Sequence, residues 1–193
     1  LVSTLWDYVD EADIIVAQNI RFDKGWFNQQ CIRAGLNPPR PYKLIDTLQM
    51  MKKNMSLPSN SLGAAAKFFN LTRKRGNEGI TLWHRCMEGE KEAFVEMLEY
   101  NDGDVVTLEE LYNALQPWCP ELPNMSLYYK DSKMRCCGCG SEDVNVVEDS
   151  VAHTALSSFD LYRCSSCGKY SRGRVNKRSK EEMQNTLTTI QYK

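Results

Sequence analysis

The sequence predicts a mixed α/β domain followed by a small β module that is held together by metal. Short apolar runs alternate with amphipathic stretches over residues 1–118, five of the eight cysteines gather within residues 136–167, and a segment with three prolines precedes them. We therefore divide the chain into the α/β domain, a linker over residues 119–134, the β module over residues 135–175 and a basic, irregular tail over residues 176–193.

The composition is that of an ordinary globular protein. Hydrophobic residues make up 42% and charged residues 25%, with 24 Lys and Arg against 25 Asp and Glu, so collagen, a wholly disordered chain and a long coiled coil are excluded. No apolar run approaches the roughly 18 residues of a membrane span. The start of the chain carries acids where a secretory signal would carry bases, so we expect a cytoplasmic protein with no membrane partner.

The hydrophobic pattern predicts two strands and several helices in the α/β domain. Apolar runs at residues 13–18 and 42–46 predict short, buried strands. Amphipathic spacing and stop signals predict helices at residues 3–10, 24–35, 47–53, 60–70 and about 90–115.

Two Cys-x-x-Cys-Gly segments predict a structural zinc site. Each short turn directs two thiolates to one ion, and the glycine tolerates a positive φ in the tight turn. The alternative is a pair of disulfides, which a cytosolic enzyme would not favour. The spacing resembles that of a zinc ribbon, and the alternating pattern of VNVVED (144–149) and FDLYRC (159–164) fits half-buried strands. The expected ligands are Cys136, Cys139, Cys164 and Cys167, with Cys137 and His153 expected outside the site.

A basic segment follows the second cysteine pair. KYSRGRVNKRSK (169–180) holds six bases and no acid, and Tyr170 lies among them. Beside a zinc ribbon, such a segment predicts contact with nucleic-acid phosphates, while a solvated tail is the alternative. The six bases are Lys169, Arg172, Arg174, Lys177, Arg178 and Lys180.

Three carboxylates lie at informative positions in the α/β domain. Asp23 follows the first predicted strand, Asp46 ends the second, and Asp104 lies four residues after Tyr100, on the same helical face. Carboxylates in such places can converge on Mg²⁺, and two such ions stabilise the attacking and leaving oxygens in phosphodiester cleavage. The structural alternatives are a helix N-cap for Asp23, a core aromatic for Tyr100 and an exposed helix acid for Asp104.

The order of these motifs resembles that of DEDD-type 3′–5′ exonucleases of the ribonuclease H-like superfamily, in their tyrosine variety. The motifs are N-x-x-F-D after a strand, I-D-T at the end of the next and Y-x-x-x-D in a late helix. The resemblance covers about residues 5–175 and is to phage-encoded and prokaryotic members with a C-terminal zinc ribbon. It implies a nuclease that uses Mg²⁺ or Mn²⁺ at a two-metal site on DNA or RNA with a single-stranded 3′ end. A phage-encoded member would act in the host cytoplasm.

The resemblance also implies a role for each matching residue. Asp104 would bind one metal directly, and Asp23 would bind the second metal directly or through water. Tyr100 would orient the attacking water. Asn19 would support the site or the scissile strand. Asp46 would help to orient the metal-binding residues without binding a metal itself.

The resemblance also bears on two residues at the start of the helix predicted at residues 60–70. Ser61 and Leu62 fall where such enzymes approach the substrate strand. His84, beside Trp83 on an expected helix, is interpreted as a packing or surface residue.

The Asp-x-Glu motif that this family carries on its first strand is not found. The acids near the start, Asp7, Asp10, Glu11 and Asp13, do not form it within a strand. The resemblance therefore implies a partial ribonuclease H-like domain that lacks its first strands and two of four metal-binding carboxylates. We expect the 193 residues alone to be inactive or nearly so, with an exposed sheet edge at residues 13–18.

Two other functions remain open. One is a non-catalytic nucleic-acid-binding protein on a degenerate nuclease fold, which the absence of an upstream Asp-x-Glu would favour. The other is a protein–protein adaptor that acts through the ribbon in a replication or repair assembly, which salt-dependent binding to bare oligonucleotides would argue against.

Overall fold

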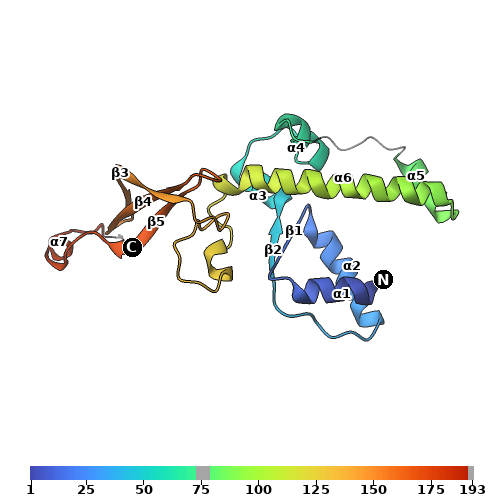
Figure 1. The fold of residues 1–193 in the computed structure, drawn as a ribbon, viewed down its shortest axis with the longest axis horizontal. Helices are drawn as coiled ribbons and strands as arrows, with labels where there is room; N and C mark the ends of the chain where they lie inside the picture. The colour runs from blue at the N-terminus through green and yellow to red at the C-terminus, as the bar shows by residue number, and fades with distance from the viewer. Residues whose placement is uncertain (73–78, 191–193) are drawn as a thin grey trace. The chain divides into compact units, whose positions relative to one another are not determined.

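The structure, a computed structural model that describes residues 1–72 and 79–190, consists of two compact units (Figure 1). The first unit is Leu1–Cys119 and contains a two-stranded parallel sheet with helices; the second is Pro120–Lys193 and contains a three-stranded antiparallel sheet. The mixed α/β class predicted from the sequence is confirmed. No helix among the described residues is long and apolar enough to cross a membrane.

The first unit alternates helices and strands and then becomes wholly helical. Its elements are α1 (Val2–Glu11), β1 (Ile14–Ala17), α2 (Ile20–Arg33), β2 (Lys43–Asp46), α3 (Thr47–Asn54), α4 (Leu62–Phe68), α5 (Ile80–Met87), α6 (Lys91–Leu115) and a short 3-10 helix, η1 (Gln116–Trp118).

Helix α2 begins four residues before its predicted start. Asn19 is its N-cap and adopts the left-handed conformation, with φ 59° and ψ 44°, which asparagine tolerates better than most residues. Asp23 therefore lies inside the first turn and does not cap the helix, so the capping alternative for Asp23 is wrong.

Strands β1 and β2 pair in parallel, from Ile14 opposite Lys43 to Ala17 opposite Asp46. Ile45 is buried on this sheet. Among the described residues neither strand has a second partner, so the outer edge of β1 presents unpaired backbone groups.

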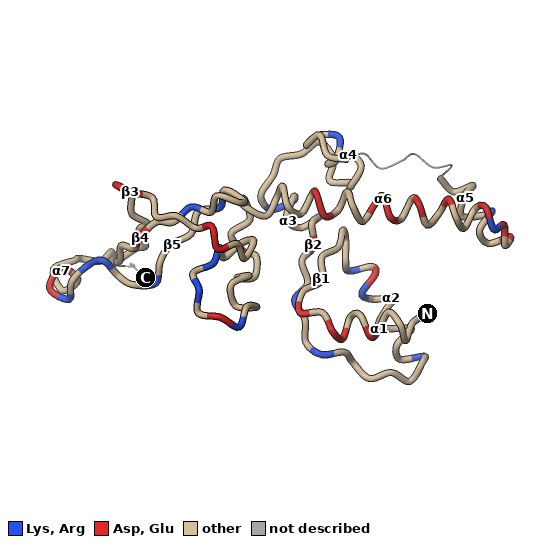
Figure 2. The backbone as a smooth tube through the Cα atoms, in the orientation of Figure 1, with Lys and Arg blue, Asp and Glu red and all other residues tan. Residues whose placement is uncertain are grey.

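Helix α6 is the longest element and packs against α3, α4 and α5. Ala93, Thr107, Leu111 and Leu115 are buried along it. The Thr107 hydroxyl donates to the carbonyl oxygens of Gly103 at 2.7 Å and Thr72 at 3.1 Å, which fixes the chain after α4 to the helix. The sequence of α6 contains seven acids and one base, and Figure 2 shows the acids spaced along the helix.

The second unit is built on a sheet with strand order β3-β4-β5. Strand β5 was not predicted, because its basic residues were interpreted only as a charged segment. The irregular tail contains a short helix, α7, which a capping box between Ser179 and Glu182 initiates. The elements are η2 (Met125–Tyr128), β3 (Val144–His153), β4 (Ser158–Cys164), β5 (Tyr170–Asn176) and α7 (Lys180–Gln184).

The proline-rich segment before the cysteines is more structured than an extended connector. It belongs to the second unit and contains η2. The Met125 N–H donates to the Cys137 carbonyl at 2.9 Å, which attaches the segment to the first cysteine turn.

Candidate functional site

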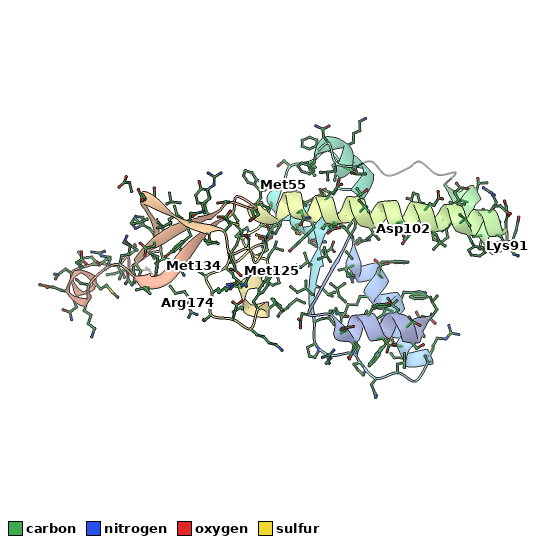
Figure 3. The ribbon with its side chains drawn as sticks, in the orientation of Figure 1. Met55, Lys91, Asp102, Met125, Met134 and Arg174 are labelled. Carbon is green, nitrogen blue, oxygen red and sulfur yellow. The ribbon has the colours of Figure 1, made fainter. Side chains whose placement is uncertain are left out.

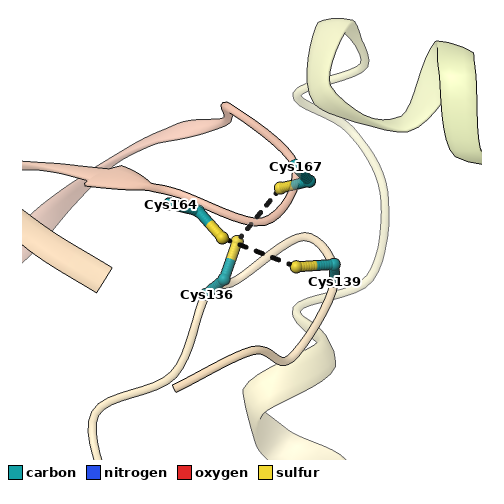
Figure 4. Close-up of side chains that lie close together, drawn as sticks. All are labelled: Cys136, Cys139, Cys164 and Cys167. Carbon is teal, nitrogen blue, oxygen red and sulfur yellow. Dashed lines mark hydrogen bonds between the residues drawn. The ribbon is translucent and has the colours of Figure 1, made fainter. Parts of the chain in front are cut away.

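The four cysteines expected to bind zinc converge in the second unit (Figure 4). Their sulfur atoms all lie within 4.8 Å of one another, with 3.6 Å between the Cys136 and Cys167 sulfurs and 3.6 Å between those of Cys139 and Cys164. Thiolates bound at about 2.3 Å to a tetrahedral ion lie about 3.8 Å apart, so this arrangement fits zinc. The separations are far too long for disulfides, and all eight cysteines are free.

Local backbone geometry explains how each cysteine pair forms. The Gly140 N–H donates to the Cys136 carbonyl at 3.0 Å, and the Gly168 N–H donates to the Cys164 carbonyl at 2.9 Å. Both glycines have positive φ, 76° and 77°, as the sequence predicted. Gly138 also donates its N–H to the Cys136 sulfur at 3.3 Å.

The thiol groups differ in their readiness to lose a proton. Burial raises the pKa of Cys139 and Cys167. At Cys164 burial also raises the pKa, but hydrogen bonds from the Cys167 and Ser166 backbone N–H groups and from neighbouring thiols outweigh it and lower the pKa to about 7. Because the thiolate is the metal-binding form, the lowered pKa of Cys164 favours metal binding relative to Cys139 and Cys167, whose pKa values are raised.

An arginine that the sequence analysis missed supports the first cysteine turn. Arg135 bonds Asp131 and Glu142, each at 2.6 Å, and donates to the Gly140 carbonyl at 3.1 Å. Its guanidinium also lies 4.0 Å from the ring centroid of Tyr129. These contacts fix the chain immediately before Cys136, and sequence spacing does not reveal them because they depend on side-chain direction.

The ends of β1 and β2 are joined by Asp46. Its Oδ1 accepts from the Leu48 N–H as the N-cap of α3 and from the Asn19 N–H, both at 2.9 Å. The carboxylate of Asp46 is thus used to fix the turn that leads into α2. The supporting role at a metal site that was expected for Asp46 stays a prediction.

Asp23 and the Tyr100–Asp104 pair lie on two depressions that share one residue. Asp23 is exposed at an open depression of about 640 Å³ with mainly apolar walls. Tyr100 and Asp104, both half-buried on α6, line another open depression of about 690 Å³. Trp83 of α5 lines both. Figure 3 labels Asp102 on α6, which lies between Tyr100 and Asp104 in the chain.

The structure does not gather the predicted carboxylates into a complete metal site. Within residues 1–72 and 79–190, the four cysteines are the one group of three or more potential metal ligands, so Asp23, Asp46 and Asp104 do not form such a group. The acids near the start lie on or just after α1, and Asp10 is bonded to Arg40 at 3.1 Å. The assignment of Asp23 and Asp104 to a divalent-cation site therefore stays a prediction.

Several other predicted residues have ordinary structural surroundings. Ser61 caps α4 by accepting from the Ala64 N–H at 3.3 Å. His84 is exposed on α5. The Nδ1 atom of His153 lies 3.1 Å from the Ser158 hydroxyl. Cys137, outside the group of four cysteines, lies 3.0 Å from the Ser171 hydroxyl.

The bases predicted to contact phosphates are not equivalent. Lys169 is only 9% exposed, and Lys177 forms an ion pair with Asp160 at 2.7 Å. Arg178 donates to the Glu182 carbonyl at 3.3 Å. Arg172 and Arg174 are exposed on β5.

Comparison with known proteins identifies one family. The family model of the RNase_H superfamily matches residues 2–116, which is more than half of the chain and includes Asp23, Tyr100 and Asp104. No curated protein and no solved structure matches the chain significantly. The match ends before the four cysteines, so the ribbon-like unit is identified by its own geometry.

Proposed function

Because the chain belongs to the RNase_H superfamily, whose nucleases use divalent metal ions, we propose that it is a 3′–5′ exonuclease that acts on single-stranded nucleic acid. The observation that carries the proposal is the position of Tyr100 and Asp104 on one face of α6, at a depression that shares Trp83 with the one at Asp23. A polar aromatic beside a carboxylate is suited to orient a water molecule near a bound cation.

In this proposal the residues of the first unit divide the work. Asp104 binds a divalent ion directly, and Asp23 binds a second one directly or through water. Tyr100 orients the attacking water. Asn19 supports the scissile strand, and Asp46 fixes Asn19 through its backbone N–H. Mg²⁺ or Mn²⁺ held there would stabilise negative charge on the phosphate oxygens.

The second unit has a structural role and a binding role in the proposal. Zinc held by the four cysteines stabilises a unit whose core contains few large apolar side chains. The basic residues after the second cysteine pair contact phosphates, which hold a strand without reading its sequence. The exposed Arg172 and Arg174 are better placed for this than the ion-paired Lys177.

The test is digestion of a single strand labelled at its 5′ end, with Mn²⁺ as the cation. Because the described residues hold no group of three or more carboxylates, we expect slow shortening from the 3′ end. Asp104→Asn should lower the rate at least tenfold, whereas Glu109→Gln, which removes an exposed acid from the same helix, should leave it unchanged. Equal rates for wild type and Asp104→Asn, or shortening from the 5′ end, would overturn the proposal.

A second function is favoured by the absence of a complete carboxylate group among the described residues. In that case the chain is a nucleic-acid-binding protein on a nuclease fold. It would bind oligonucleotides with strong salt dependence and leave them intact with either Mg²⁺ or Mn²⁺.

A further inference from the structure

Strands β4 and β5 place two arginine–aromatic pairs on one face of the sheet in the second unit. The Arg163 guanidinium carbon lies 5.6 Å from the Tyr170 ring centroid, and that of Arg172 lies 4.2 Å from the Phe159 ring centroid. The register sets Arg163 opposite Tyr170 and Leu161 opposite Arg172. Since side chains alternate between faces along a strand, Arg163, Tyr170 and Arg172 share a face.

The two pairs differ in which partner is accessible. Tyr170 is 55% exposed, and the exposed Arg163 guanidinium lies over one side of its ring, so the remainder of the side chain is open to solvent. Phe159 is only 9% exposed, and the exposed guanidinium of Arg172 lies over it. The face therefore presents the partly exposed ring of Tyr170 and the guanidinium of Arg172, which lies over the buried ring of Phe159.

The charges on this face are available for an anion. Among the described residues no ion pair involves Arg163, Arg172 or Arg174, in contrast to Lys177 with its bond to Asp160. An open depression of about 570 Å³ lies beside Arg163, with Asn145, Ser165 and one acid, Glu148, among its lining residues.

We propose that this face binds a single-stranded polynucleotide by stacking one base on Tyr170 while Arg163 and Arg172 contact the adjacent phosphates. Aromatic rings stack on any base, and arginines add charge attraction and planar stacking. A duplex keeps its bases stacked inside, so it offers the ring no partner. The inference rests on the proposed function only in taking nucleic acid as the ligand and does not require cleavage.

The experiment measures fluorescence anisotropy with the full, zinc-loaded chain in the absence of Mg²⁺ and Mn²⁺. The probes are an oligothymidine strand of about 12 nucleotides, an abasic strand of the same length and the corresponding duplex. Tyr170→Ala should weaken binding to oligothymidine roughly tenfold and to the abasic strand less than about twofold, because stacking is worth about 1–3 kcal/mol per base. Wild type should bind the duplex more weakly than the single strand.

Conservative and control variants separate stacking from general damage to the sheet. Tyr170→Phe keeps the ring and should bind within about twofold of wild type. Val175→Ala alters an 80% exposed residue of the same strand and should have no effect. Arg172→Ala should lower the slope of log affinity against log salt by about 0.7, the value for one phosphate contact on a single strand. Every variant must retain one zinc ion.

Two results would overturn the inference: equal binding of oligothymidine by wild type and Tyr170→Ala, or an equal loss on the abasic strand. Failure of the nuclease proposal would be seen in the digestion experiment instead, as the absence of cleavage that depends on Asp104. A chain that binds through Tyr170 but does not cleave would support this inference and contradict the nuclease.

Discussion

The four cysteines and the three carboxylates reach their positions by different routes. Each cysteine pair is set by one tight turn of four residues, and one strand pairing brings the two turns together. Asp23, Asp46 and Asp104 come from α2, the end of β2 and α6, so their separation depends on the packing of the whole first unit. The four-cysteine group therefore needs only two local turns and one strand pairing. The carboxylates can come together only if the helices and strands of the first unit pack correctly.

The largest expected effect comes from removing one zinc ligand. Cys164→Ser should abolish stoichiometric zinc binding and unfold the three-stranded sheet, because structural zinc contributes about 10–16 kcal/mol in small zinc-binding peptides. Zinc content by atomic absorption and amide protection of β3–β5 measure this. Cys137→Ser is the matched control, since Cys137 lies outside the group. Retained zinc in Cys164→Ser would show that this thiol is not a ligand.

Gly140 and Gly168, which follow the two cysteine pairs, allow a test of how each cysteine turn is formed. A Cβ at Gly140 would lie 2.6 Å from the Tyr129 ring, whereas a Cβ at Gly168 meets nothing within 4 Å. Both alanine variants should lose about 1–2 kcal/mol for the left-handed backbone, and Gly140→Ala should lose more through the clash. Chelator competition for zinc should rank Gly140→Ala as the weaker binder. The opposite order would argue against the Tyr129 contact.

Substitution of Asp46 tests how much the hydrogen bond from the Asn19 N–H contributes to the stability of the first unit. Asp46→Ala should lower the free energy of unfolding by about 1–2 kcal/mol, because it removes the N-cap of α3 and leaves the Asn19 N–H without its acceptor. Ser61→Ala removes only the local cap of α4 and should cost less. Urea titration followed by tryptophan fluorescence measures both. An equal loss in the two variants would show that the Asn19 contact contributes nothing.

The smallest expected effect concerns Glu110 on α6. Hydrogen bonds from the Thr72 hydroxyl at 2.6 Å and the Thr72 N–H at 2.7 Å lower the pKa of Glu110 below 4.5. A lowered pKa stabilises the folded state above about pH 4.5, and this contribution disappears as the pH falls through the folded-state pKa. Glu110→Gln should therefore flatten the acid side of the stability profile of the first unit. An unchanged profile would contradict the assignment.

The elements could be predicted well where local signals were strong. The long helix ending at Leu115, the strand ending at Asp46 and the turns at Gly140 and Gly168 follow from periodicity, propensity and turn chemistry. The start of α2 was missed because Asn19, a residue in the left-handed conformation, lies at a position that periodicity does not mark. Strand β5 was missed because arginines occupy positions where apolar residues would have shown the alternation of apolar and polar side chains that is typical of a strand.

The same distinction applies to the residues proposed to contact nucleic acid. Arg163 was absent from the predicted nucleic-acid contacts because it lies outside the basic segment, although its register places it opposite Tyr170. Lys169 was included for its charge, yet it is buried in the fold. Charge in the sequence thus marked a basic segment, while strand pairing and burial determined which of its residues are accessible.

By itself the sequence determined the cysteine turns, the main helices and the motif order that led to the RNase H family, because these depend on residues within a few positions of one another. Only the tertiary structure decided that Asp46 fixes Asn19, that Trp83 is shared by the depressions at Asp23 and Asp104, and that Arg163 faces Tyr170. The first two depend on residues distant in the chain and the third on the pairing of neighbouring strands, so their geometry follows from packing and strand register rather than from spacing along the sequence.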